Sequence, residues 1–113
     1  MKRLIDYVKA IEGTASPYEI VRSDSQSETK HDPTGSTIEI TRRVHHFSDG
    51  VSVEYEREYD DGAPYPGCKE FWYTYKVVNS NGFEFEGEMT KLFQSHSEIQ
   101  NWLKCNGESA NSN

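Results

Sequence analysis

The stretch 36–59 constrains the fold of this chain more than any other. Its two runs, 37–47 and 51–59, alternate apolar and polar side chains with the period of two that a half-buried strand requires. Asp49-Gly50 lies between them, and this dipeptide favours a tight type I′ turn, since both central residues of that turn need a positive φ. The stretch therefore predicts a β-hairpin.

A two-residue turn at Asp49-Gly50 would also fix which residues face one another across the hairpin. Counting outward gives an apolar face with Val44 opposite Tyr55 and Ile40 opposite Tyr59. The other face pairs His45 with Glu54, Arg43 with Glu56, and Thr41 with Glu58. One register thus separates apolar pairs from pairs of opposite charge, which is the arrangement that cross-strand energetics favour.

The rest of the pattern predicts two helices and three more strands. Apolar residues at helical spacing begin at Leu4 and stop before Gly13, which favours a helix end. Ser95-x-x-Glu98 resembles a capping box and predicts a final helix to Lys104. The further strands are expected at 18–22, 69–79 and 83–89.

Two connections need a choice between alternatives. The polar run 23–35 has no periodicity and reads as a long loop, for which disorder is a simpler interpretation than function. At 80–82 a three-residue loop is preferred, because a two-residue Asn-Gly turn would bury alternate glutamates at several kcal/mol each. The chosen loop sets Val77 opposite Phe85, Lys76 opposite Glu86 and Tyr73 opposite Met89.

Together these elements predict an α+β fold with an N-terminal helix, a five-stranded antiparallel meander sheet and a C-terminal helix, both helices on one sheet face. A chain of 113 residues suits a single domain, expected at 1–107, with 108–113 as a disordered tail. The face toward the helices is expected to carry Ile38, Ile40, Val44, Tyr55, Tyr73, Tyr75, Phe85 and Met89.

Composition excludes several classes of function. The formal net charge of −7 disfavours direct contact with nucleic acid, which needs clustered Lys and Arg. Sparse cysteines, Cys68 and Cys105, suit free thiols in a reducing compartment, and no apolar run approaches the ~20 residues of a membrane span. We expect a cytoplasmic protein without membrane contact. An apolar content of 34% implies a thin core and favours a homodimer as one alternative.

The first candidate site is an acidic outer sheet face. The predicted strands turn six glutamates outward together with Trp72: Glu54, Glu56, Glu58, Glu84, Glu86 and Glu88. The simpler interpretation is a solvated face whose cross-strand ion pairs contribute about a few tenths of a kcal/mol each. The functional hypothesis is a small non-catalytic binding protein that contacts a basic patch of a protein partner, with Trp72 as the anchor.

The second candidate site follows from Arg42, which the two-residue turn sets opposite Arg57 on the apolar face. Like charges directly opposite are unfavourable, so Asp6 or Glu12 of the first helix could offset them. Alternatively, the two arginines could bind a small anion in a pocket between that helix and the sheet. The walls of this pocket would be Tyr55 and Tyr75.

Catalysis and metal binding are the least favoured hypotheses. His45 and His46 are strand neighbours that point to opposite faces and cannot chelate one ion together. Without Cys/His spacing we expect no metal and no cofactor. The chain has no G-x-S-x-G motif, and glutamates on an exposed strand lack the desolvation that acid–base chemistry needs.

Overall fold

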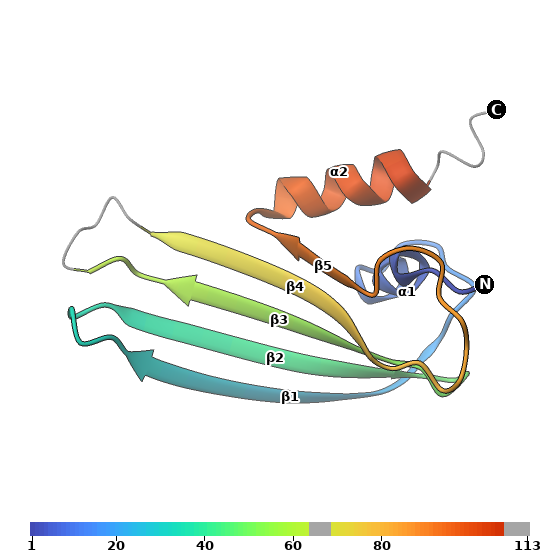
Figure 1. The fold of residues 1–113 in the computed structure, drawn as a ribbon, viewed down its shortest axis with the longest axis horizontal. Coiled ribbons are helices and arrows are strands. Elements are labelled where there is room, and N and C mark those ends of the chain that lie inside the picture. The colour runs from blue at the N-terminus through green and yellow to red at the C-terminus, as the bar shows by residue number, and fades with distance from the viewer. Residues whose placement is uncertain (64–68, 108–113) are drawn as a thin grey trace.

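The computed structural model describes residues 1–63 and 69–107, and it has two helices on one face of a five-stranded sheet (Figure 1). In chain order the elements are α1 (Leu4–Ile11), β1 (Ile20–His31), β2 (Thr37–Phe47), β3 (Ser52–Asp60), β4 (Glu70–Asn79), β5 (Thr90–Phe93) and α2 (His96–Gly107). Sheet order equals chain order and every pairing is antiparallel, which confirms the predicted meander. The predicted tail 108–113 and Cys68 lie outside the described residues.

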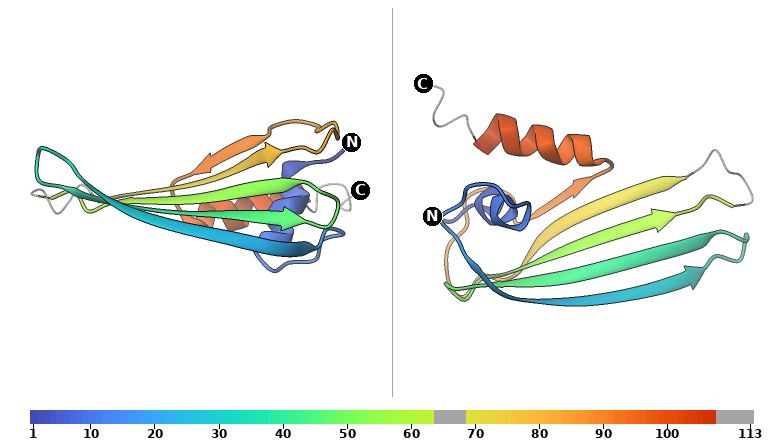
Figure 2. Two further views of the ribbon diagram at one scale, coloured as in Figure 1. Left: turned by 90° about the horizontal axis from the view of Figure 1, so that it is seen from below. Right: turned by 180° about the vertical axis from the view of Figure 1, so that it is seen from behind.

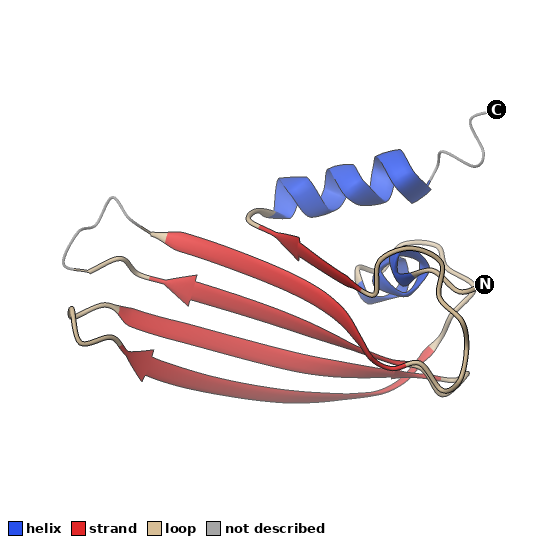
Figure 3. Ribbon diagram, in the orientation of Figure 1, coloured by secondary structure: helices blue, strands red, loops and turns tan. Residues whose placement is uncertain are grey.

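The sheet is much longer than the helices that cover it. The molecule measures 48 × 31 × 21 Å, because strands β1–β4 run on past α1 and α2 (Figures 1 and 2). We call the end with the 48–50 turn the near end and the end with the 32–36 turn the far end. Figure 3 shows both helices over the near half, on the face that we call the helix face; the opposite face is the outer face. Neither helix in the described ranges is long and apolar enough to cross a membrane.

The core lies between the helices and the near half of the sheet. Helical spacing turns Leu4, Tyr7 and Val8 toward the sheet, and α2 contributes Ile99 and Leu103. The buried sheet residues of this cluster are Phe47, Val51, Val53, Tyr73, Tyr75, Val77 and Phe93. All of them lie on the helix face, so one side of the sheet forms the hydrophobic core.

The central hairpin forms, but its turn differs from the predicted one. Three residues, Ser48-Asp49-Gly50, close it: the Phe47 amide donates to the Val51 carbonyl at 2.9 Å, and Gly50 has φ 89°. The longer loop turns Phe47 and Val51 into the core, where they are 3% and 0% exposed. A two-residue turn would have pointed Phe47 outward, and burying such a side chain contributes about 1.5–3 kcal/mol.

This extra turn residue shifts the register by one and exchanges the faces of β2. A shift of one residue moves every side chain of a strand to the other face. Ile38, Ile40 and Val44, predicted inside, therefore lie on the outer face, whereas Tyr55, Tyr73 and Tyr75 lie on the helix face as predicted. The predicted pairs are wrong: Val44 faces Glu54, Ile40 faces Glu58, His45 faces Val53, Arg43 faces Tyr55, and Thr41 faces Arg57.

The predicted loop 23–35 is also wrong, because most of it belongs to β1. This strand of 12 residues pairs with β2 along its length and forms one edge of the sheet. Residues 21–31 are exposed, so no apolar alternation marks the strand in the sequence. Backbone hydrogen bonds to β2 hold a segment whose side chains stay in water on both faces.

The predicted strand 83–89 does not form in the sheet. After a turn with positive φ at Asn81 and Gly82, the chain runs beside the N-terminus, where the Lys2 amide donates to the Glu84 carbonyl at 2.9 Å. Strand β4 pairs with β5 instead, so Tyr73 faces Phe93 and not Met89. The predicted pairs Val77–Phe85 and Lys76–Glu86 are therefore wrong as well; Lys76 faces Thr90. The structure thus buries Phe93 at 4% exposure and leaves Met89 at 41%.

The predicted end of the first helix and the predicted start of the last are confirmed by hydrogen bonds, whereas α2 continues to Gly107, past the predicted end at Lys104. Helix α1 ends with Gly13 at φ 77°, and the Thr14 amide donates to the Lys9 carbonyl at 2.8 Å, as in a Schellman motif. At the start of α2 the Glu98 amide donates to Ser95 Oγ at 3.2 Å. These ends fix where the last residues of α1 and the first of α2 lie over the sheet.

Candidate functional site

The outer face carries Trp72 and three of the six predicted glutamates. Glu54 lies between Val44 and Lys76, Glu56 between Arg42 and Thr74, and Glu58 between Ile40 and Trp72. We call Ile40, Glu54, Glu56, Glu58 and Trp72 the outer patch. Its carboxylates alternate along β3, as the sequence predicted.

The other three predicted glutamates are not part of this patch. Glu84, Glu86 and Glu88 are exposed residues of the segment between β4 and β5. The Glu86 amide donates to the Lys2 carbonyl at 2.8 Å, which holds this segment beside the N-terminus. The prediction of six carboxylates on one sheet surface is therefore wrong, because 83–89 does not pair with β4.

Arg42 links two acidic side chains across the outer face. Its Nε donates to Glu56 at 3.0 Å and its Nη1 to Glu28 at 3.1 Å. The hydrogen bond to Glu56, and next the charges of Glu56 and Glu28, raise the pKa of the Arg42 guanidinium. Glu56 is thus partly neutralised, while Glu54 and Glu58 face apolar side chains on β2.

The centre of the outer patch is apolar and closely covered. Ile40 is only 4% exposed although it lies outside the core cluster and both helices are on the opposite face. Its cross-strand neighbours are Glu28 and Glu58, whose hydrocarbon stems are long enough to cover it. Trp72, the next residue in this row, is half-buried. The patch therefore presents a row of carboxylates on β3, with the aromatic side chain of Trp72 beside Glu58.

The predicted pair of arginines does not form. Arg42 lies on the outer face, and Arg57 lies on the helix face opposite Thr41, with its guanidinium carbon 5.7 Å from the centre of the Phe71 ring. The anion pocket predicted around these two arginines is therefore wrong in its basic residues. The register shift moves a different arginine, Arg43, opposite Tyr55.

A pocket of about 170 Å³ does lie on the helix face, between the end of α1 and the start of α2. Its walls include the predicted Tyr55 and Tyr75. The full lining is Ile11, Glu12, Arg43, His45, Tyr55, Tyr75 and His96, and we call this the inner pocket. Arg43 and His45 were not among the predicted pocket residues. A three-residue turn at 48–50, like the one expected at 80–82, places both on the helix face.

Glu12 and Tyr75 are joined inside the inner pocket. The Tyr75 hydroxyl donates to Glu12 Oε1. Burial, and next this carboxylate, raise the pKa of Tyr75 far above its ordinary value, so the hydroxyl stays protonated. Burial likewise raises the pKa of Tyr55. Both tyrosines are therefore neutral hydrogen-bonding groups at physiological pH.

His45 is the one residue whose ring nitrogen is buried and without a partner within the described residues 1–63 and 69–107. The side chain is 8% exposed; Nδ1 lies 2.8 Å from Ser23 Oγ, and Nε2 is the unpartnered atom. Burial, with the positive charge of Arg43, lowers the pKa of His45, so the ring is neutral at pH 7. Leaving such an atom unsatisfied costs about 1–3 kcal/mol, which marks the position as unusual.

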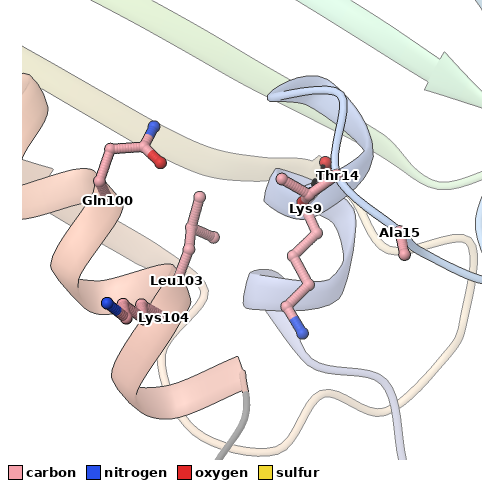
Figure 4. A pocket seen from close by; sticks show the side chains of 6 residues that line it. All are labelled: Lys9, Thr14, Ala15, Gln100, Leu103 and Lys104. Carbon is pink, nitrogen blue, oxygen red and sulfur yellow. Dashed lines mark hydrogen bonds between the residues drawn. The ribbon is translucent and has the colours of Figure 1, made fainter.

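A wider groove of about 330 Å³ runs between the two helices (Figure 4). Lys9 and Thr14 lie on its α1 side and Gln100, Leu103 and Lys104 on its α2 side. Leu103 is the buried member of this lining and belongs to the core, whereas Gln100 and Lys104 are exposed. The groove is the outer margin of the helix–helix contact.

The described residues contain no group of three or more His, Cys, Asp or Glu side chains that could hold a metal ion. Comparisons with protein-family models, with curated proteins and with solved structures found no match for this chain.

Proposed function

We propose that this protein is a non-catalytic interaction protein whose outer patch contacts a basic patch on a partner protein. The observation that carries the proposal is the row of Glu54, Glu56 and Glu58 along β3 beside the half-buried Trp72, on a face that neither helix covers. Interfaces of this kind combine an apolar or aromatic centre with a polar rim, and Trp is enriched among the residues that dominate binding energy.

Charge supports a basic partner. The patch holds three carboxylates, with Arg42 paired to Glu56, and the whole chain carries a formal net charge of −7. Complementary charge speeds encounter and disfavours acidic partners, and added salt weakens both effects. Binding should therefore weaken as ionic strength rises.

Affinity capture from the native host with matched variants tests this proposal. The patch variant Glu54→Gln/Glu58→Gln/Trp72→Ala should lose a basic protein that the wild type retains, and calorimetry with that purified protein should show the same loss. The control Glu84→Gln/Glu88→Gln removes two charges outside the patch and should bind as the wild type does. Equal binding by the patch variant, or equal loss in the control, would contradict the proposal.

A homodimer through the free edge of β1 is a second candidate, supported by the charges along this strand. Two copies that pair antiparallel about Ser27 would set Asp24 of each copy opposite Lys30 of the other. These side chains are 60% and 59% exposed and so can reach a neighbouring strand. Exposed strand edges are ready templates for pairing, and symmetric dimers are the commonest oligomers.

Charge exchange tests the dimer. Asp24→Lys and Lys30→Asp should each convert a dimer into a monomer in light-scattering measurements, since each sets like charges opposite. The double variant restores opposite charges and should restore the dimer. A monomeric wild type, or single variants that dimerise as well as the wild type, would rule out this pairing.

A further inference from the structure

The inner pocket brings together groups of opposite charge on opposite sides. Glu12, just after the last turn of α1, binds Tyr75 on β4, whereas Arg43 lies two strands away on β2, opposite Tyr55. His96, at the start of α2, also lines the pocket. The carboxyl end of a helix favours positive charge and the amino end favours negative charge. The carboxyl end of α1 and Glu12 thus both favour a positive group of a ligand. The amino end of α2 and Arg43 both favour a negative group.

His45 adds a hydrogen-bonding atom that the folded chain leaves unused. Its Nε2 is buried and without a partner in the described part of the chain, while Ser23 occupies Nδ1. When the Ser23 hydroxyl donates to Nδ1, the neutral ring carries its proton on Nε2 and offers it as a donor. His45 lines the pocket, but less than 1 Å² of Nε2 is accessible. A ligand that accepts this hydrogen bond would remove the cost of the unsatisfied atom, and it reaches the atom only when the neighbouring side chains shift.

The size of the pocket limits the ligand. Its volume of about 170 Å³ is below the roughly 300–1,000 Å³ of pockets for drug-sized ligands, so it suits a molecule of a few heavy atoms. The tyrosine rings of Tyr55 and Tyr75, 5.1 Å apart between centroids, supply flat walls for its hydrocarbon part.

We propose that the inner pocket binds a small zwitterion of the size and charge of alanine, with its carboxylate toward Arg43 and His45 Nε2 and its ammonium group toward Glu12. The pocket lies on the helix face and the outer patch on the opposite face, so this site is independent of the proposed docking function.

Nuclear magnetic resonance titration of the full chain tests the site. L-Alanine should shift the ring signals of His45, while acetate and methylammonium, which each carry one of the two charges, should bind far more weakly. Arg43→Gln and Glu12→Gln should each weaken alanine binding about ten- to a hundredfold, the range expected when a hydrogen bond to a charged group is lost.

Arg57→Gln is the matched control, because Arg57 lies on the same face but not in the lining of the pocket. It should bind alanine as the wild type does. The proposal is overturned if alanine leaves the His45 signals unmoved or if acetate binds as tightly as alanine. It is also overturned if Arg57→Gln loses as much affinity for alanine as Arg43→Gln and Glu12→Gln do. None of these results depends on whether the outer patch binds a protein.

Discussion

At the scale of single residues, His45 differs most from an ordinary surface or core side chain. It is a polar ring held neutral inside the molecule, in contact with Ser23 and close to the charges of Arg43, His46 and Glu12. Burial is the main cause that lowers its pKa, and Arg43 and His46 act in the same direction, whereas Glu12 opposes them. The folded state therefore resists protonation of this ring.

This resistance predicts how stability depends on pH. Unfolded His45 binds a proton near its ordinary pKa of about 6.5, above its pKa in the folded chain. Its contribution is thus fully present above about pH 6.5 and is lost as pH falls toward the folded pKa. Urea unfolding between about pH 7 and pH 5 should show a decrease in the free energy of unfolding that is smaller in His45→Phe. An equal slope in His45→Phe would contradict the prediction.

At the scale of elements, the turns decide which side chains share a face. Alternation alone predicts the correct faces for the side chains of β3 and β4, because most of their aromatic residues fall on one face. Strand β2 was not, since Ile38, Ile40 and Val44 on one side compete with Phe47 on the other, and the length of the turn settles the choice. Its Asp-Gly dipeptide fits both a two-residue and a three-residue turn. The three-residue turn therefore places Arg42 and Arg57 on opposite faces of the sheet and brings Arg43 into the lining of the inner pocket.

The contact between two turns gives a prediction for Gly50. A Cβ atom at this position would lie 2.8 Å from Asn81 Cγ, and its φ of +89° is unfavourable for other residues. Asn81 cannot move freely, because its side-chain amide donates to the Asp49 carbonyl at 2.8 Å. Gly50→Ala should lower the free energy of unfolding by about 2–4 kcal/mol, the sum of strain and a displaced contact.

Gly35→Ala is the control for backbone strain alone. Gly35 has φ +100°, and an added Cβ would meet nothing within 4 Å. It should cost about 1 kcal/mol, clearly less than Gly50→Ala, in the same thermal or urea unfolding experiment. Equal losses in the two variants would show that the contact with Asn81 is not important.

At the scale of the whole molecule, the order of elements was predictable and the extent of the sheet was not. Helix ends, capping and aromatic alternation are local signals, and they gave two helices on one face of a meander. Strand β1 and the segment 83–89 depend on distant partners: β1 is stabilised by pairing with β2, and 83–89 is held by Lys2. Such pairing leaves no periodic pattern in a polar edge strand.

The uneven cover of the sheet has a dynamic consequence. Only the near half is packed against the helices, whereas at the far end Glu39 is exposed and Tyr59 and Phe71 are half-buried on the helix face. Regions with few buried apolar contacts open at lower free energy than the core. Amide protons of β2 and β3 around Glu39 and Tyr59 should therefore exchange with deuterium at least about tenfold faster than those around His45 and Val53. The sheet would then fray from its far end inward, with the two helices holding the other end closed.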